Sequence, residues 1–311
     1  IIDVIHGFRK SGYPVVVNDR EHGVTSKRME IWPKHFEAVI DDLLVERLCM
    51  SNEIQMEFFK RCKFPPDRMI LTGKPDSDYW KHSGPPMQPQ KIHHLLREDR
   101  TIMVFYAFGK LNYLNHYYAG EKRDWTALGD DFHEVLLELL RRNKDRLQIV
   151  YKIGGKPARD NYPLFDRFAT EARNIGGEDA LVVLDGSYST LDLLSVSNLV
   201  VGFHSFALIE AMFTKQPIFC GAWGDLFSDI KETLLPLYRS QGLTFLDSKN
   251  ALLTACDQFI QAPFQWTLGK DAENARKVTT EEWLYKPDGR SSERLMDVIE
   301  DVASEYWGSR R

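Results

Sequence analysis

The residues with the clearest chemical potential follow an apolar run near the middle of the chain. Leu199–Val201 is typical of a buried parallel strand, and the turn Gly202-Phe203-His204-Ser205 follows it directly. A helix is predicted to begin near Phe206, so that Glu210 lies in its first turns. Unpaired N–H groups at a helix N-terminus stabilise an anion, which puts His204 and Ser205 beside a phosphate and Glu210 beside ribose hydroxyls. The segment therefore predicts a nucleotide site; the alternative is an ordinary strand–loop–helix connection in which Ser205 only caps the helix.

A polar loop after the predicted strand Pro14–Asn18 carries the candidate general base. His22 stands beside a glycine in this loop, so it can approach a substrate hydroxyl closely and take its proton near neutral pH. Glu21 is the second candidate for the same role. Lys27 and Arg28, slightly further along, could bind an anionic acceptor or the phosphates of the donor. The alternative is a solvated loop whose charges bind nothing specific.

Two segments with glycines could bind the phosphates of the same ligand. A buried strand delivers Lys152 to its carboxyl end, and Lys156 follows after two glycines that let a ligand approach the backbone. The loop after the strand that ends at Tyr106 carries Gly109 and Lys110, where a pyrophosphate would lie. This loop lacks the G-x-G-x-x-G fingerprint, so neither NAD nor FAD is expected. The alternative is that these lysines simply face solvent.

A third polar segment precedes the last helix of the chain. Ser291 or Ser292 is the predicted N-cap of an amphipathic C-terminal helix. Ser292 and Arg294 could also contact donor phosphates if this helix begins at the cleft.

The elements that must position these residues alternate between strands and helices. Helices are predicted for the first ten residues and for 33–44 and 52–61, and an apolar stripe indicates a helix around 132–140. Strand–helix alternation implies an α/β fold with doubly wound parallel sheets that bind ligands at the carboxyl ends of their strands. The predicted strands are 14–18, 47–50, 68–72, 102–106, 147–152, 181–184, 199–202, 217–219 and 243–246.

The chain of 311 residues is long enough for two such domains. We predict an N-terminal Rossmann-like domain on the acceptor side over 1–80, a Pro-rich linker over 81–98, a nucleotide-donor domain over 99–285, and a C-terminal helix over 286–311. The first domain carries only about half the strands of a Rossmann-like domain. We therefore expect part of it to be missing at the N-terminus; the alternative is a small domain.

The composition is that of a soluble globular protein, with 43% hydrophobic residues and a net charge of −5. Nucleic acid is not an expected partner, although local basic patches could meet an anionic membrane surface. The four scattered cysteines are expected to be buried free thiols in a reducing cytoplasm, and no cysteine–histidine spacing suggests a metal site. No apolar run approaches the length that crosses a bilayer. We expect a cytoplasmic protein that could lie at the inner face of the membrane. We expect it to need no cofactor and no metal.

Four segments carry a resemblance to known families. His22-Gly23-Val24-Thr25-Ser26-Lys27 resembles the His-Gly-Thr-Pro-Leu-Lys element of the CDP-glycerol glycerophosphotransferases, and Asp288–Arg294 is similar to their Asp-Gly-Lys-Ala-Ser-Glu-Arg element. Arg68–Asp78 resembles the Val-Thr-Gly-Asn-x-x-x-Asp stretch at the domain junction of two-Rossmann sugar-nucleotide enzymes. Gly202–Ala211 resembles the donor-binding element of glycosyltransferases of bacterial surface-carbohydrate and capsule biosynthesis.

The resemblance implies a GT-B fold of two Rossmann-like domains, a nucleotide-activated donor in the cleft and no metal requirement. It implies that His22 is the base and that His204 and Ser205 bind donor phosphate. Teichoic-acid polymerases carry Asp-Tyr-Ser-Ser where this chain has Phe203-His204-Ser205-Phe206, and Glu210 suits a sugar nucleotide better.

The leading hypothesis is a metal-independent glycosyltransferase of cell-surface polysaccharide biosynthesis. Its donor would be a CMP-, CDP- or UDP-linked sugar, and its acceptor a glycan or a lipid-linked group, with peripheral membrane association. The alternatives are a CDP-glycerol-type glycerophosphotransferase, a non-hydrolysing sugar-nucleotide epimerase, and a non-catalytic nucleotide- or glycan-binding protein.

Overall fold

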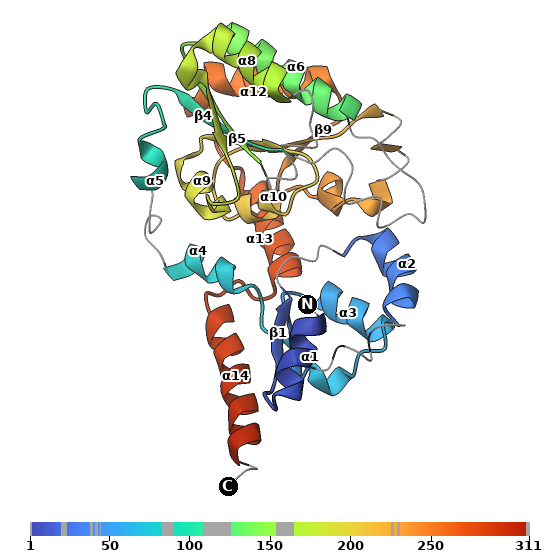
Figure 1. Ribbon diagram of the computed structural model, residues 1–311. Coiled ribbons are helices and arrows are strands. Elements are labelled where there is room, and N and C mark those ends of the chain that lie inside the picture. The colour runs from blue at the N-terminus through green and yellow to red at the C-terminus, as the bar shows by residue number, and fades with distance from the viewer. Residues whose placement is uncertain are drawn as a thin grey trace. The chain divides into compact units, whose positions relative to one another are not determined.

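The chain divides into two compact α/β units in a computed structural model (Figure 1). The first unit combines Ile1–Ser83 with Val278–Arg311, and the second is Gly84–Lys277. The boundary between them in sequence falls inside helix α13 (Lys270–Leu284). The structure describes residues 2–19, 24–37, 40, 43, 45–82, 90–107, 126–153, 165–224, 227–228 and 231–308.

The first unit is built on a three-stranded parallel sheet of order β1-β2-β3. Val16 pairs with Arg47 across β1 and β2, and Leu48 pairs with Met69 across β2 and β3. The sheet and its helices bury a core that includes Leu48, Met50 and Phe58. In chain order the elements are α1 (Ile2–Lys10), β1 (Val16–Asp19), α2 (Ser26–Phe36), β2 (Arg47–Met50), α3 (Glu53–Arg61), the 3-10 turn Pro66–Arg68, β3 (Met69–Leu71), the 3-10 turn Pro75–Asp78, α4 (Tyr79–His82) and, after α13, α14 (Ser291–Gly308).

Helix α2 corrects one prediction from the sequence. We expected a helix over 33–44, with Pro33 at its first turn, but the helix runs from Ser26 to Phe36 and Pro33 lies inside it. The Thr25 side chain accepts a hydrogen bond from the Arg28 N–H and so caps the helix start. The Glu37 N–H donates to the Pro33 carbonyl, so the helix continues through the proline and ends just after it.

The second unit contains a six-stranded parallel sheet of order β6-β5-β4-β7-β8-β9. The strands predicted from the sequence are all present, within two residues at each end, and the doubly wound α/β fold class is confirmed. In chain order the elements are α5 (Gln90–His93), β4 (Thr101–Tyr106), α6 (Thr126–Asn143), β5 (Leu147–Lys152), α8 (Phe165–Gly176), the 3-10 turn Glu178–Ala180, β6 (Leu181–Leu184), α9 (Thr190–Val196), β7 (Leu199–Gly202), α10 (Ala207–Ala211), β8 (Ile218–Gly221), the 3-10 turns Lys231–Thr233 and Pro236–Arg239, β9 (Thr244–Leu246), α12 (Lys249–Gln261) and the 3-10 turn Pro263–Gln265.

Helices α6, α8 and α12 lie together on one face of this sheet, and α9 and α10 lie on the other (Figure 1). The α6 residues that the sequence stripe predicted to be apolar and inward-facing are all buried in the shared core: Phe132, Val135, Leu136, Leu139 and Leu140. Each such side chain contributes roughly 1.5–3 kcal/mol of burial free energy, so the sheet is a rigid platform for the loops at its edge.

The strand order reverses between β4 and β7. From β4 the chain moves outward to β5 and β6, and then returns to the other side of β4 and continues through β7, β8 and β9. Tyr106 at the end of β4 pairs in register with Gly202 at the end of β7. In open α/β sheets the loops diverge at such a reversal and leave a crevice at the carboxyl ends of the strands, where ligands bind.

The start of α14 is held by residues from the other end of the first unit. The Asp78 carboxylate accepts hydrogen bonds from the backbone N–H groups of Ser291, at 2.9 Å, and Ser292, at 2.6 Å. Asp78 is therefore the capping group, and the prediction that Ser291 or Ser292 is the N-cap was wrong, since both lie inside the helix. The Arg294 guanidinium pairs with Asp288 and donates from Nε to the Thr72 carbonyl at 2.8 Å.

Gly73 lets these two segments approach each other. Its φ is +83°, and a Cβ at this position would lie 2.6 Å from Ser291 Oγ and 2.9 Å from the Tyr285 carbonyl oxygen. Only glycine fits both the backbone conformation and the space.

The four cysteines of the chain are buried and unbonded, as predicted. Among the described helices, none combines the length and the apolar character that a membrane span requires.

We predict that Asp78→Asn destabilises the first unit by about 1–3 kcal/mol. Asparagine has one acceptor oxygen and no charge, so one helix N–H loses its partner and the favourable interaction with the helix dipole disappears. Urea unfolding and hydrogen exchange of the first turn of α14 measure the effect. Asp67→Asn, at an exposed carboxylate of the same unit, is the control; equal midpoints and equal exchange in the two variants would contradict the assigned cap.

Candidate functional site

The turn after β7 leads into α10 through a local serine turn. The Ser205 Oγ accepts a hydrogen bond from the Ala207 N–H at 3.3 Å, and the Ser205 carbonyl accepts one from the Leu208 N–H. The N-cap position of α10 is Phe206, so Ser205 is not the N-cap residue, but its hydroxyl occupies an N–H group for which an anion would compete. Helix α10 has five residues and continues into tight turns, so its dipole contributes less than the sequence interpretation assumed.

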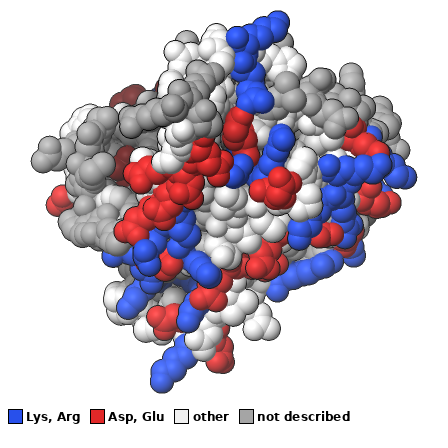
Figure 2. Space-filling view, turned by 90° about the horizontal axis from the view of Figure 1, so that it is seen from below, with Lys and Arg blue, Asp and Glu red and all other residues white. Residues whose placement is uncertain are grey.

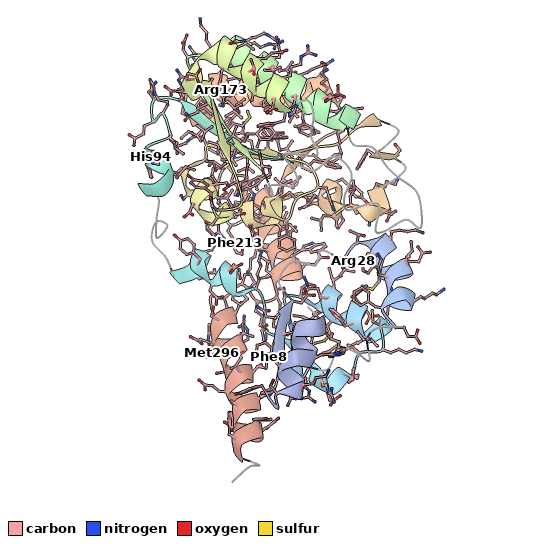
Figure 3. All side chains as sticks on the ribbon, viewed as in Figure 1. Phe8, Arg28, His94, Arg173, Phe213 and Met296 are labelled. Atoms are coloured by element: carbon pink, nitrogen blue, oxygen red, sulfur yellow. The ribbon has the colours of Figure 1, made fainter. Side chains whose placement is uncertain are left out.

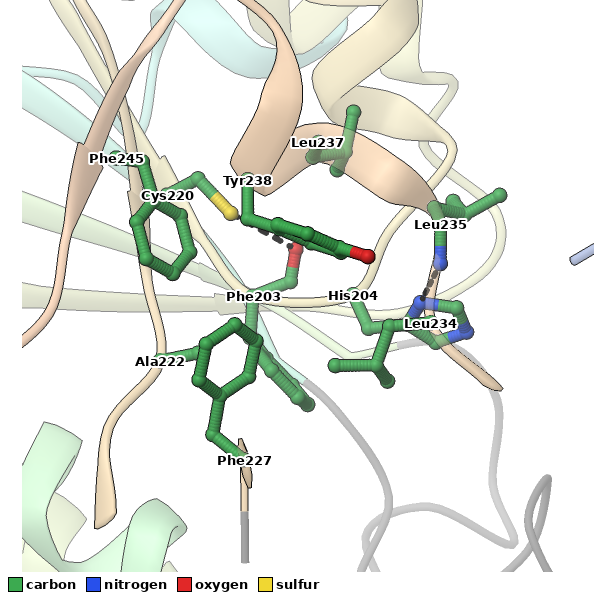
Figure 4. Close-up of a pocket in the computed structure, with 10 residues that line it drawn as sticks. All are labelled: Phe203, His204, Cys220, Ala222, Phe227, Leu234, Leu235, Leu237, Tyr238 and Phe245. Carbon is green, nitrogen blue, oxygen red and sulfur yellow. Dashed lines mark hydrogen bonds between the residues drawn. The ribbon is translucent and has the colours of Figure 1, made fainter. Parts of the chain in front are cut away.

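His204 is a neutral hydrogen-bond acceptor in this structure. Its Nδ1 accepts a hydrogen bond from the Leu235 N–H at 2.9 Å, shown as a dashed line in Figure 4. The proton of the neutral ring is therefore on Nε2. Burial lowers the pKa of His204 from 6.5 to about 4, so the ring is uncharged near neutral pH. Next to a phosphate, His204 would offer one hydrogen bond and no positive charge.

An apolar pocket lies beside His204 at the carboxyl ends of β7, β8 and β9 (Figure 4). Its empty volume, part of which is open to solvent, is about 210 Å³. The rings of Phe227, Tyr238 and Phe245 pack on one another along one side, with centroids 5.4–6.3 Å apart. The lining residues are Phe203, His204, Cys220, Ala222, Phe227, Leu234, Leu235, Leu237, Tyr238 and Phe245.

Glu210 lies on α10, which follows β7. Its charge acts on Tyr106 at the end of β4, the strand on the other side of the reversal. Burial raises the pKa of Tyr106 well above its usual value, and the nearby Glu210 carboxylate raises it further. Tyr106 is the last residue of β4, and His204, Ser205 and Glu210 follow β7 in the turn and in α10, so all four come after or at the ends of the two strands between which the strand order marks a ligand crevice. Reasoning from the sequence missed Tyr106, because it ends an apolar strand; a hydroxyl-bearing ring at the carboxyl end of a strand was the available signal.

Lys152 lies at the carboxyl end of β5, next to β4 in the sheet. Its ammonium donates a hydrogen bond to the Asp185 carbonyl oxygen in the loop after β6. Burial lowers the pKa of Lys152, and Asp185 opposes this shift. Its assignment to donor phosphate stays a prediction.

The predicted acceptor residues lie in the first unit. Lys27 forms an ion pair with Glu30 at 2.9 Å. Arg28 on α2 is 5% exposed, and its guanidinium lies 4.9 Å from the Trp32 ring centroid and 5.5 Å from that of Phe58 (Figure 3). Cation–π contacts of this kind stabilise a buried guanidinium. The acceptor roles of Lys27 and Arg28 stay predictions.

Ser292 and Arg294 belong to the start of α14, where their described contacts fasten this helix within the first unit. Their role toward a donor stays a prediction. The remaining predicted site residues lie outside the described residues: Glu21, His22, Gly109, Lys110 and Lys156.

Arg276 on α13 is a buried cation that the sequence did not indicate. Its guanidinium donates to the carbonyl oxygens of Thr214, Gln216 and Gly242, at 2.6–2.9 Å. These carbonyls belong to the segments that lead into β8 and β9, so Arg276 supports the half of the sheet that carries the pocket.

The charges in the coloured part of Figure 2 are mixed, with acidic and basic side chains lying among one another on the face shown. Within the described residues there is no group of three or more His, Cys, Asp or Glu side chains that could hold a metal ion.

No protein family and no curated protein matches the chain in sequence. Solved structures match it in fold. The wall teichoic acid polymerase TagF aligns with 93% of this chain and 68% of its own, at 12% identity and a TM-score of 0.61. A TagF variant soaked with CDPG aligns with 93% of this chain and 64% of its own, at 13% identity and a TM-score of 0.59. A Listeria monocytogenes protein named as a UDP-N-acetylglucosamine 2-epimerase aligns with 98% of this chain and 72% of its own, at 12% identity and a TM-score of 0.53.

At these identities the likeness concerns the fold. The chain has two parallel α/β sheets in two units, as expected for the GT-B fold that the sequence resemblance implied, and this expectation is confirmed.

We predict that His204 makes the protein less stable in acid. Between pH 6.5 and about 4 the unfolded chain binds a proton on this residue that the folded ring does not. The contribution of His204 to the free energy of unfolding is therefore complete above pH 6.5 and is lost as the pH falls toward 4. His204→Gln keeps an acceptor oxygen for the Leu235 N–H, so the urea midpoint should depend less on pH over this range.

His93→Gln, at an exposed histidine of the same unit, should leave that dependence unchanged. If the urea midpoint of His204→Gln changes with pH as steeply as that of the wild type, the folded ring takes up protons freely and the prediction is wrong.

Proposed function

We propose that this protein is a metal-independent glycosyltransferase that uses a nucleotide-activated sugar in cell-surface polysaccharide biosynthesis. One observation carries the proposal: the strand order of the second unit reverses between β4 and β7, and His204, Ser205 and Glu210 follow β7 at this point. Hydrogen-bond donors for a phosphate and a carboxylate for a ribose therefore occur together where an α/β sheet binds its ligand.

The names of the fold neighbours support a nucleotide-linked donor. TagF was soaked with CDPG, and the Listeria protein is named for a UDP-linked sugar. A CDP-, UDP- or CMP-linked sugar is the donor class we propose. The acceptor would be a glycan or a lipid-linked group, and a lipid-linked acceptor would bring the protein to the inner face of the membrane.

The proposed reaction is a displacement at the anomeric carbon of the donor. His22, with Glu21 as the second candidate, takes the proton of an acceptor hydroxyl, whose oxygen forms the new glycosidic bond. The bond between the anomeric carbon and the phosphate oxygen breaks, and the nucleotide leaves with its extra negative charge. Ser205, the N–H groups of the turn, Lys152 and the lysines after β4 and β5 stabilise that charge in place of a metal.

We predict that nucleotides stabilise the protein in the presence of EDTA. In a panel of CMP, CDP, UDP and GDP, a ligand at 100 times its Kd adds about 2.7 kcal/mol, a shift of roughly 5–10 °C in the Tm of a unit of this size. Glu210→Gln should lower the affinity for the nucleotide that binds best about tenfold, because the ribose hydroxyls lose a charged acceptor. Glu178→Gln, at the amino end of the same sheet, is the control. Absence of a shift with every nucleotide would refute the proposed donor site.

We predict that His22→Ala abolishes transfer while nucleotide affinity stays within about twofold of the wild type, because the base acts on the acceptor and not on the donor. Release of the nucleotide in the presence of acceptor measures the first quantity, and the thermal-shift titration measures the second. Equal loss of both would contradict the role of His22.

A sugar-nucleotide epimerase is the second candidate, because the Listeria neighbour shares the fold. An epimerase forms product from the donor alone, whereas the transferase forms none until an acceptor is added. A non-catalytic binding protein would bind the nucleotide and turn over in neither assay.

A further inference from the structure

Tyr106 carries a buried hydroxyl group that the fold does not use. The residue is 4% exposed, and its hydroxyl has no hydrogen-bond partner among the described residues. Buried polar groups are nearly always hydrogen-bonded, so an unpaired one in a native fold points to a partner that arrives later. Tyr106 ends β4 at the strand-order reversal, which is the point where we place the nucleotide.

The direction of the Tyr106 side chain follows from its neighbour. Phe105 points into the core beneath α6 and α8, with its ring 5.4 Å from Phe132 and 5.1 Å from Tyr151. Successive side chains of a strand point to opposite faces, so Tyr106 points to the face that α9 and α10 cover. Gly202 on β7 lies beside Tyr106: a Cβ there would lie 3.5 Å from the Tyr106 Cβ, which is an ordinary contact distance, and 3.2 Å from Leu208 Cδ2.

Two polar side chains on these helices lie near the Tyr106 hydroxyl. The charge of the Glu210 carboxylate on α10 raises the pKa of Tyr106, and a hydrogen-bonding interaction with the Thr190 side chain on α9 lowers it. This interaction with Thr190 falls outside the geometry of a full hydrogen bond, so the Tyr106 hydroxyl keeps no partner of good geometry. A carboxylate has two oxygens and about four acceptor positions, so Glu210 can accept from a tyrosine and from ribose at the same time.

We propose that Tyr106 is a positioning residue, whose hydroxyl donates to the Glu210 carboxylate when a nucleotide binds and so orients it toward the ribose hydroxyls. This inference rests on the proposed nucleotide site and adds a specificity to it: the site selects ribonucleotides over nucleotides that lack the 2′ and 3′ hydroxyls. Without those hydroxyls, orienting Glu210 has no effect on affinity.

The test compares Tyr106→Phe with the wild type on two ligands. The first is the nucleotide among CMP, CDP, UDP and GDP that binds best, and the second is its 2′,3′-dideoxy form. The wild type should bind the ribonucleotide at least tenfold more tightly than the dideoxy form. Tyr106→Phe should bind the ribonucleotide several-fold to tenfold more weakly than the wild type, and should bind the dideoxy form equally well.

Tyr151→Phe is the matched control. Tyr151 is on the adjacent strand, its hydroxyl lies 2.9 Å from His133 Nε2, and its ring packs in the core on the other face of the sheet. This control should lower the Tm of the ligand-free protein, because it removes the hydrogen bond between Tyr151 and the buried His133, and it should not change the ligand preference. Tyr106→Phe should leave the ligand-free Tm unchanged or raise it, because the lost hydroxyl had no partner.

Three results would overturn the inference. Equal weakening of both ligands by Tyr106→Phe, or no weakening of the ribonucleotide, would refute the positioning role while the nucleotide site itself stands. A wild type that binds both ligands equally would refute the contact between Glu210 and ribose. A wild type that binds no nucleotide would refute the proposed function, and with it this inference.

Discussion

The parallel pairing of β4 with β7 is the constraint on which the rest of the second unit depends. Strand–helix–strand connections are right-handed, so a sheet that grows from β4 toward β6 and then from β7 toward β9 puts the helices of its two halves on opposite faces. In open α/β sheets the loops at such a reversal separate and leave an opening. Tyr106 and Gly202, which pair in register, are the last residues of β4 and β7 at this reversal. The position of the candidate site is thus a consequence of strand order, whatever the loops contain.

The chemistry that the structure puts at this opening differs from a cluster of positive charges. His204 is neutral because it is buried and because its Nδ1 is occupied by the Leu235 N–H. Ser205 already accepts a hydrogen bond from the Ala207 N–H, and Lys152 already has a carbonyl partner. A nucleotide bound here would exchange existing hydrogen bonds for its own, and the charge of its phosphates would be balanced by amide dipoles together with Lys152 and the lysines that follow β4 and β5 in the sequence.

The first unit depends on contacts between residues far apart in sequence. Asp78 caps a helix that begins 213 residues later, and the Asn52 side chain donates to the Trp283 carbonyl at 2.9 Å while its oxygen caps α3. Two segments for which the sequence showed a resemblance meet in these contacts: Arg68–Asp78, similar to two-Rossmann sugar-nucleotide enzymes, and Asp288–Arg294, similar to the CDP-glycerol glycerophosphotransferases. In this structure both have a structural role, because they join the C-terminal helix to the sheet of the first unit.

The sequence by itself determined the strands, the fold class and the place of the β7 turn, because buried parallel strands are continuous apolar runs and polar turn residues must end them. It also determined the inward face of α6, since apolar residues repeated at the helical period mark the face that packs against the core. The start of α2 was misplaced, because Pro33 was taken as a helix beginning when Thr25 supplies the cap.

Only the tertiary structure decided which groups are partners. Local patterns favoured a serine cap for α14, whereas the fold brings in the Asp78 carboxylate, a stronger acceptor than a serine hydroxyl. Three further features also come from contacts between segments far apart in the chain: the three carbonyls that Arg276 binds, the partner of His204, and the effect of Glu210 on Tyr106. Such contacts leave no local pattern, because a hydrogen bond or a pKa depends on the atoms nearby in space and not on those nearby in the chain.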